Sequence, residues 1–311
     1  MTNAAVVRIV QDPRFERLVP ADAEVIRLAD GAIWAEGPVY IPDQDTVMWS
    51  DVRGNVVRRW SAADGAHDVH RPSDFSNGHT LDHDGRILAC EHGPRRVARY
   101  EPDGSRTTIV DRYEGRRLNS PNDLVVASDG AIWFTDPPYG ILDDTEGYRA
   151  DSELGGCFVF RLDRTTGALT VATDALVHPN GLAFSPDETV LYVSDTSVAR
   201  IEDGNHHIVA FDVIDRRRLA SPRVFAIIEP GVSDGLRVDV EGNVWTSAGD
   251  GIHVLDPAGV ELGRILLPQE ASNCTFGGAD GRRLFITATS TVWAIDVGIR
   301  GAVTPWVDTG S

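Results

Sequence analysis

Short apolar runs, each bounded by Gly, Asp or Pro, recur along the whole chain. They mix β-branched and aromatic residues, which favours β-strands, and long stretches with a period of 3.6 residues are scarce. The five clearest runs are residues 46–50, 131–135, 190–194, 243–247 and 283–287. The pattern predicts a chain of short antiparallel strands with little helix.

A small polar dipeptide opens each of six repeating units, and an apolar strand, an Asp/Gly turn and an aromatic strand follow it. The six openings are Glu36-Gly37, Asn77-Gly78, Asn122-Asp123, Asn180-Gly181, Asp234-Gly235 and Gly277-Gly278. Successive openings are 41, 45, 58, 54 and 43 residues apart. This period is typical of four-stranded propeller blades. We therefore predict an all-β fold, a six-bladed β-propeller with four-stranded antiparallel blades.

The repeat also predicts how the chain is divided. Residues 1–22 are expected to form an irregular N-terminal lead-in, and residues 23–311 a single propeller domain. Residues 24–28 are predicted to form a strand that closes the ring against the last blade, which removes exposed sheet edges. Residues 137–155 are rich in Pro, Asp and Gly, so we predict a long loop that overhangs a pocket.

Charge and composition narrow the function. The chain has 47 acidic and 29 basic residues, a net charge of −18, which argues against nucleic acid or an anionic membrane as a partner. No stretch approaches the roughly 18 apolar residues of a membrane helix, and the N-terminus lacks a signal-peptide pattern. The three widely spaced cysteines indicate neither a disulfide framework nor a zinc ribbon. We expect a soluble cytoplasmic protein, with its oligomeric state left open.

The openings also suggest a metal site. The innermost strand of every propeller blade faces the central channel, so Glu36, Asn77, Asn122, Asn180 and Asp234 are predicted to approach one channel mouth. Any one of these is an ordinary turn residue, but their shared repeat position favours convergence. Carboxylate and amide oxygens suit a hard cation. We therefore predict one divalent ion, with Ca²⁺ as the preferred identity, held by Glu36, Asn122, Asn180 and Asp234. The absence of His and Cys argues against a dedicated zinc site, although Mg²⁺, Mn²⁺ and Zn²⁺ stay as alternatives.

Seven motifs in order carry a family resemblance. They are Ala35-Glu36-Gly37-Pro38-Val39, Cys90-Glu91-His92-Gly93, Ser120-Pro121-Asn122-Asp123-Leu124, Trp133-Phe134-Thr135-Asp136-Pro137-Pro138-Tyr139-Gly140, Pro179-Asn180-Gly181-Leu182-Ala183-Phe184-Ser185-Pro186-Asp187, Ser233-Asp234-Gly235-Leu236-Arg237-Val238-Asp239 and Cys274-Thr275-Phe276-Gly277-Gly278. Together they resemble the gluconolactonase, regucalcin (senescence marker protein) and luciferin-regenerating family. The second and fourth motifs resemble bacterial gluconolactonases more than animal regucalcin.

The resemblance implies a hydrolase that opens a sugar lactone, a small molecule similar to gluconolactone. It also implies that Glu36, Asn180 and Asp234 hold the metal and that Asn122 lies at the metal or at the substrate. Regucalcin-like members have a substrate-binding arginine two residues before the Asn122 position, where this chain has Ser120. Arg117 or His79 is predicted to take its place.

For the mechanism we expect the metal to act as a Lewis acid on the lactone carbonyl. A water attacks, with Asp234 as the candidate general base; alternatively, water bound at the metal is itself the nucleophile. Asp136 and Tyr139 begin the long loop, where they either contact sugar hydroxyls or fix the Pro-Pro turn. His92 and His178 are predicted to be structural.

Two other functions compete with lactone hydrolysis. The same oxygen-rich metal site would also serve a phosphotriesterase of the diisopropyl fluorophosphatase type, which requires a more apolar pocket. A non-catalytic calcium-binding propeller is the other alternative, because this fold also serves as a binding platform.

Overall fold

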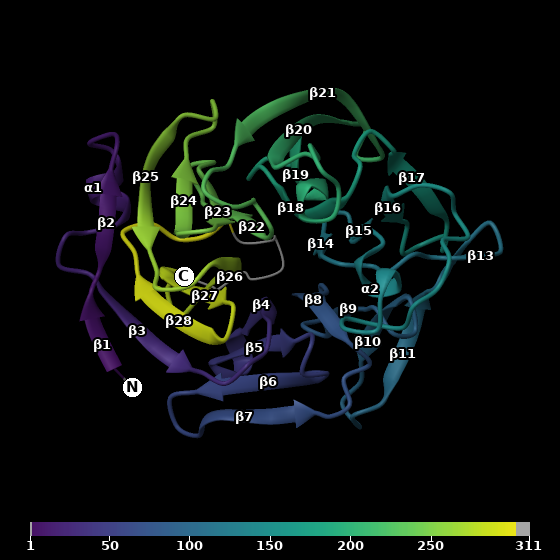
Figure 1. Cartoon of the computed structure of the whole chain (residues 1–311), viewed down its shortest axis with the longest axis horizontal. Helices are drawn as coiled ribbons and strands as arrows, with labels where there is room; N and C mark the ends of the chain where they lie inside the picture. The colour runs from purple at the N-terminus through teal and green to yellow at the C-terminus, as the bar shows by residue number, and fades with distance from the viewer. Residues whose placement is uncertain (1, 303–311) are drawn as a thin grey trace.

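The computed structural model describes residues 2–302, and it shows six antiparallel sheets arranged around a central axis (Figure 1). This confirms the predicted six-bladed propeller with four-stranded blades. The innermost strands are β4, β8, β14, β18, β22 and β26, and each contacts the next around the ring. The predicted propeller range runs on to residue 311, and residues 303–311 lie outside the described part.

The first three blades follow one another along the chain. Blade one consists of β4 (Ala35–Ile41), β5 (Thr46–Asp51), β6 (Val56–Ser61) and β7 (Gly65–His70). Blade two consists of β8 (Ser76–Leu81), β9 (Ile87–Glu91), β10 (Arg96–Tyr100) and β11 (Arg106–Val110). Blade three consists of β14 (Leu124–Val126), β15 (Ile132–Asp136), β16 (Phe158–Leu162) and β17 (Leu169–Thr173).

Blades five and six each take up a fifth strand from the N-terminus. Blade four consists of β18 (Pro179–Phe184), β19 (Val190–Asp195), β20 (His207–Ile214) and β21 (Arg218–Ile227). Blade five consists of β22 (Leu236–Val238), β23 (Val244–Ala248), β24 (Gly251–Leu255), β25 (Glu261–Leu266) and β2 (Val7–Val10). Blade six consists of β26 (Ala271–Gly277), β27 (Arg283–Ala288), β28 (Thr291–Asp296), β3 (Glu24–Ala29) and β1 (Thr2–Ala5).

The remaining elements are short. A two-stranded hairpin precedes blade three, and single helical turns interrupt four connections. These elements are β12 (Arg112–Tyr113), β13 (Arg116–Arg117), α1 (Phe15–Leu18), α2 (Tyr139–Leu142), η1 (Pro42–Gln44) and η2 (Ser197–Ala199). The described residues contain no helix long and apolar enough to cross a membrane.

The hydrophobic core lies between the blades. Each pair of neighbouring blades encloses its own apolar cluster, as where Val47 and Trp49 of blade one meet Phe285 of blade six. A strand in the middle of a blade is therefore covered on both faces, and every residue of β5 and β15 is buried. This explains why the second strand of each unit reads as a continuous apolar and aromatic run instead of alternating with polar residues.

The N-terminus closes the ring, and more of it packs onto the blades than the sequence indicated. The predicted strand at residues 24–28 is confirmed, because β3 pairs antiparallel with β28 in blade six. The expectation of an irregular lead-in was wrong: β1 pairs with β3, β2 pairs with β25, and Phe15 and Leu18 of α1 join the core between blades five and six. Partners this distant in sequence leave no local signal.

Candidate functional site

The repeat openings meet at one end of the inner strands, as predicted. Backbone hydrogen bonds join several inner strands there to the next blade: Gly78 N–H donates to the Asn122 carbonyl, and Gly181 N–H to the Asp234 carbonyl, both at 2.9 Å. The same bond runs from Gly235 N–H to the Ser272 carbonyl at 2.7 Å. We call this set the channel ring; its members are Glu36, Asn77, Asn122, Asn180, Asp234 and Ser272.

The predicted sixth opening was wrong. Gly277 pairs with Arg283 at the far end of β26, whereas Ser272 holds the ring position in blade six. The chain has Ser272-Asn273 where most blades have a residue followed by glycine, so the dipeptide pattern led to the wrong place. The correct position lies five residues earlier in the sequence.

The glycine after most ring residues has a steric cause. A Cβ on Gly181 would lie 2.3 Å from the Asp234 carbonyl oxygen, and one on Gly78 would lie 2.5 Å from the Asn122 carbonyl oxygen. Real Cβ atoms do not approach other atoms this closely, so only glycine lets neighbouring inner strands come together here. The ring residue before it is thereby held at the channel.

Three ring side chains have acceptor oxygens that the protein leaves unused. Glu36 accepts from its neighbour Gly37 N–H and from Asn273 Nδ2 at 3.1 Å, both on Oε2. The Asp234 carboxylate and the Asn122 amide make no hydrogen bond with any residue in 2–302, although Asn122 is buried. These unpaired oxygens keep some solvent access, so they are available to a bound group.

The electrostatics point to a cation as that group. Burial raises the pKa of Asp234 well above its usual range, and repulsion from Glu36 adds to the increase. The pKa of Glu36 is also raised, mainly by burial, although the Asn273 hydrogen bond opposes the shift. Two carboxylates that repel one another in a low-dielectric site would be stabilised by a positive ion between them.

Amide groups complete the donor set. Asn180 donates from Nδ2 to Thr196 Oγ1 at 3.0 Å, and Asn77 donates from Nδ2 to His92 Nε2 at 3.3 Å. Both amides therefore leave Oδ1 free. Within the described range, no three His, Cys, Asp or Glu side chains form a metal-binding group, so an ion here would depend on amide oxygens beside the two carboxylates. That all-oxygen set fits Ca²⁺.

A second polar layer supports the channel ring. The Arg237 guanidinium lies 3.4 Å from an Asp123 carboxylate oxygen, which joins blade five to blade three across the channel. Asp123 approaches Gly78, and Asn273 approaches Gly235, in the space that a Cβ would fill. The layer thus places one permanent positive charge near Glu36, beside the carboxylate of Asp123.

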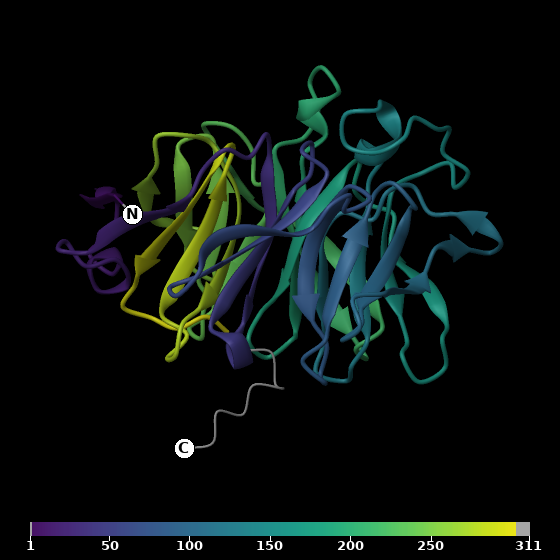
Figure 2. The same cartoon turned by 90° about the horizontal axis from the view of Figure 1, so that it is seen from below.

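The blade-three insertion, residues 137–155, is the loop that the sequence predicted. Its helical turn α2 and the loop carrying η2 project from the same face of the molecule (Figure 2). Ser120 Oγ donates to the Pro137 carbonyl at 2.6 Å and accepts from Gly140 N–H at 2.9 Å. The residue at the regucalcin arginine position therefore anchors this insertion.

Several predicted substrate residues have structural partners instead. Asp136 is fully buried: its Oδ2 accepts from Asn119 N–H at 2.8 Å, and its Oδ1 has no partner among the described residues. His79 is buried, with Nδ1 2.8 Å from the Gly37 carbonyl and Nε2 3.2 Å from Ser76 Oγ. Neither side chain is available to a ligand in the channel.

The other two predicted substrate residues lie in different places. Arg117 is on β13 at the outer edge of the disc (Figure 1), where its guanidinium donates to the Pro94 carbonyl at 2.7 Å. The structure does not bring it to the channel ring. Tyr139 is buried, and its hydroxyl lies 2.6 Å from Thr196 Oγ1, which connects it to the ring residue Asn180.

Asp136 leads to a prediction about pH. Burial raises its pKa to about 7, against an unfolded value of 3.8. Since the folded state holds this proton more tightly, the contribution of Asp136 to stability is lost as pH rises from about 4 to 7, by at most about 1.4 kcal/mol per pH unit. Asp136→Asn should remove this loss of stability. The melting temperature of the variant minus that of wild type should therefore increase as pH is raised from 4 to 8.

Thermal unfolding of both proteins across this pH range measures the effect. The exposed carboxylate of Asp151 lies in the same insertion, so Asp151→Asn controls for the loss of one negative charge. A difference between Asp136→Asn and wild type that stays constant with pH would contradict the prediction.

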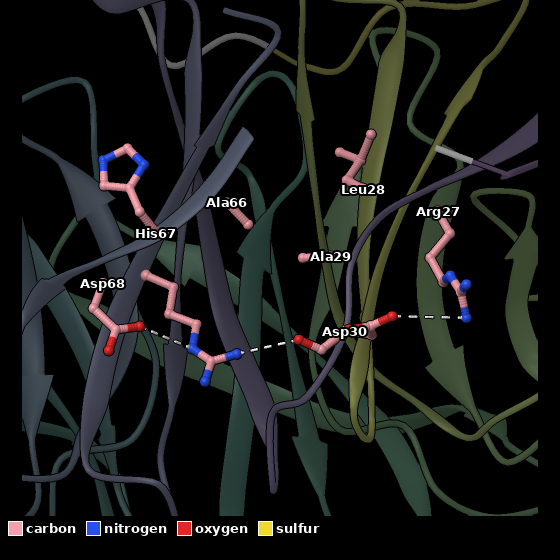
Figure 3. A pocket seen from close by; sticks show the side chains of 8 residues that line it. Arg27, Leu28, Ala29, Asp30, Ala66, His67 and Asp68 are labelled. Atoms are coloured by element: carbon pink, nitrogen blue, oxygen red, sulfur yellow. Dashed lines mark hydrogen bonds and ion pairs between the residues drawn. The ribbon is translucent and has the colours of Figure 1, made fainter. Parts of the chain in front are cut away.

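The molecule also has a surface hollow away from the ring. It lies between β3 of blade six and β6 and β7 of blade one (Figure 3), and its lining includes Arg58, which pairs with Asp68 at 3.3 Å and with the Asp30 carbonyl at 3.3 Å. Its other arginine, Arg27, lies 3.9 Å from the Asp30 carboxylate, so both are already paired with acceptors of the protein. The channel ring is the stronger candidate, because it alone combines unused acceptors with converging carboxylates.

Sequence reasoning missed the residues that support the ring. Asp123, Asn273 and Arg237 act on residues of other blades, and Thr196 bonds both Asn180 of its own blade and Tyr139 of blade three. Their sequence positions therefore carry no pairing signal. Among the missed positions, only Ser272 could have been found from the repeat. It lies 38 residues after Asp234, a spacing close to the 41 residues between the first two openings.

Comparisons with known proteins agree with the fold and identify the family. Residues 34–290 match the model of the SMP-30/gluconolactonase/LRE-like region. The gluconolactonase of Zymomonas mobilis is 33% identical over 94% of this chain and 86% of its own. The solved structure of a gluconolactonase from Xanthomonas campestris is 40% identical, with a TM-score of 0.89 over 96% of this chain and 97% of that one.

A calcium-binding protein, regucalcin from Agrobacterium tumefaciens, shares the fold alone: it is 19% identical with a TM-score of 0.72, over 90% of this chain and 95% of that one. The matched region contains the channel-ring residues from Glu36 to Ser272. This chain therefore belongs to the SMP-30/gluconolactonase/LRE-like family.

Proposed function

We propose that the protein is a metal-dependent hydrolase that opens the ester ring of a sugar lactone to the aldonic acid. The observation that carries this proposal is the channel ring, where the buried Glu36 carboxylate, the partly exposed Asp234 carboxylate and the buried Asn122 amide have oxygens with no partner in the described protein. Relatives that cover nearly the whole chain and are named gluconolactonase support the substrate class. Proposed ligands are Glu36, Asn122, Asn180 and Asp234.

The roles follow from the chemistry of ester hydrolysis. A divalent ion in the ring supplies Lewis acidity for a carbonyl oxygen. Asp234 is the proposed general base, because its carboxylate is partly exposed and accepts no hydrogen bond from a described residue. Asn122, whose amide is equally free, is proposed to bind the lactone as well as the ion. We propose Ca²⁺ from the donor chemistry; Mg²⁺, Mn²⁺ and Zn²⁺ are the alternatives to test.

Metal removal tests this function. Purified protein is treated with EDTA and assayed by pH-stat on a panel of aldonolactones and aliphatic lactones, with each of the four cations added back. We expect hydrolysis of at least one sugar lactone to disappear with EDTA and to return with one cation. Hydrolysis that is insensitive to EDTA would rule out the metal mechanism.

The same assay separates the two alternative functions. Organophosphate esters are included in the panel, and preferential hydrolysis of these would favour a phosphotriesterase. A protein that binds Ca²⁺ but opens no lactone after reconstitution would be a non-catalytic propeller. The many polar groups at the ring favour a polyhydroxylated substrate over an apolar phosphotriester.

A further inference from the structure

A chain of hydrogen bonds runs from the blade-three insertion to the channel ring. The Tyr139 hydroxyl lies 2.6 Å from Thr196 Oγ1 and 3.1 Å from the Thr196 carbonyl oxygen. Thr196 Oγ1 in turn lies 3.0 Å from Asn180 Nδ2. All three side chains are buried, so water does not compete for these bonds, and the geometry decides which group donates.

The number of donors and acceptors indicates which group donates in each hydrogen bond between Tyr139, Thr196 and Asn180. The Thr196 carbonyl can only accept, and it accepts from Ala199 N–H at 3.0 Å and from the Tyr139 hydroxyl at 3.1 Å. The Thr196 hydroxyl then donates to the Tyr139 oxygen, and its own Oγ1 accepts from Asn180 Nδ2. Every proton in this arrangement has an acceptor.

The opposite orientation of the Asn180 amide breaks this pattern. In that orientation Asn180 Oδ1 would lie against Thr196 Oγ1 and would accept the one hydrogen bond that the Thr196 hydroxyl can donate. Tyr139 would then donate to Oγ1, and the Thr196 carbonyl would keep only its bond from Ala199 N–H. The orientation in the structure, with Asn180 Nδ2 on Thr196 Oγ1, keeps all of these bonds and leaves Asn180 Oδ1 facing away from Thr196.

The insertion holds Tyr139 firmly in this position. Gly140 N–H donates to Ser120 Oγ, and a Cβ on Gly140 would lie 2.5 Å from the Cβ of His92, so the loop packs directly on blade two. On its other side the Tyr139 ring meets His178 edge-on, at 5.4 Å between ring centres. Contacts on both sides leave the hydroxyl little freedom to leave Thr196.

The insertion acts on blade two in a similar way. The Glu146 carbonyl lies 2.9 Å from His92 Nδ1, which must donate to it. His92 Nε2 is then an acceptor for Asn77 Nδ2, and Asn77 Oδ1 is left free. Two ring amides, those of Asn77 and Asn180, are thus oriented from one loop.

We propose that Tyr139 and Thr196 are positioning residues that direct Asn180 Oδ1 at the metal, a role that rests on the proposed metal site. This differs from the expectation that Tyr139 contacts sugar hydroxyls, because its one proton already has an acceptor in the protein. Groups that orient a metal ligand typically change metal affinity by about 10–100-fold when they are removed.

Calcium titration of metal-free protein by calorimetry, without substrate, tests the proposal. Tyr139→Phe and Thr196→Val should each weaken Ca²⁺ binding by about 10-fold, whereas Thr196→Ser keeps the hydroxyl and should bind nearly as wild type does. Tyr192→Phe is the matched control, since Tyr192 is a buried tyrosine of blade four that packs on Phe225. Melting curves of the metal-free variants check that each one folds.

Kinetics at saturating Ca²⁺ give the second measurement. The KM of Tyr139→Phe for a lactone should match wild type once the ion is bound. Unchanged Ca²⁺ affinity in both Tyr139→Phe and Thr196→Val, or a raised KM with unchanged affinity, would overturn this inference alone. Wild-type protein that binds no divalent cation would overturn the proposed metal site together with it.

Discussion

An Asp234→Asn variant should lose about 10²–10⁴-fold in kcat toward the best lactone while it keeps its fold. That range is what a general base contributes to such reactions. Asparagine has the same size, and the bond from Asp234 N–H to Ser247 Oγ involves only the backbone of residue 234. The change therefore removes the base and one ligand charge without disturbing the inner strand.

Single-turnover and steady-state rates at saturating metal measure this loss. Metal affinity of the variant is determined first, so that activity is compared with the site filled. Asp43→Asn, an exposed carboxylate of η1 at the opposite end of β4, controls for the change in net charge. Substantial activity of metal-replete Asp234→Asn would refute the assignment of Asp234 as base.

A Glu36→Gln variant should show opposite changes in stability and in metal binding. Glutamine relieves the repulsion between the buried Glu36 carboxylate and that of Asp234, so the metal-free protein should melt at a higher temperature. The ion loses half of its carboxylate charge, so its affinity should fall by more than the 10–100-fold typical of residues behind the ligands. The stabilisation that a bound ion gives to wild type should largely vanish.

Melting temperatures with and without Ca²⁺ distinguish this outcome from simple misfolding. Wild type should melt higher with Ca²⁺ than without it, Glu36→Gln should melt at one temperature in both conditions, and Asp43→Asn should behave as wild type. A Glu36→Gln protein that is as strongly stabilised by Ca²⁺ as wild type would remove Glu36 from the ligand set.

The repeat made most of the fold predictable. Apolar and aromatic runs between Asp/Gly turns are local signals, and the spacing of openings such as Asn77 and Asn180 sets the number of blades. The prediction failed at Gly277, because blade six has no glycine after its ring residue Ser272. There the space beside Gly235 is filled by the Asn273 side chain, a contact that only the folded ring reveals.

Candidate side chains were harder to rank than strands. His79, Asp136 and Tyr139 all carry chemistry that suits a substrate pocket, and the sequence places each beside a motif. The structure shows all three buried with protein partners. Whether a polar group is free or already bonded depends on atoms brought close by other blades, and periodicity contains no information about that.

The sequence by itself thus determined the six-bladed ring, the closing strand and the gathering of Glu36, Asn122, Asn180 and Asp234, because strand patterns and repeat position are properties of short segments. Only the tertiary structure decided which oxygens remain unused and which way the amides face. Tyr139 and Thr196 are 57 residues apart, and their contact exists only after blades three and four have packed together.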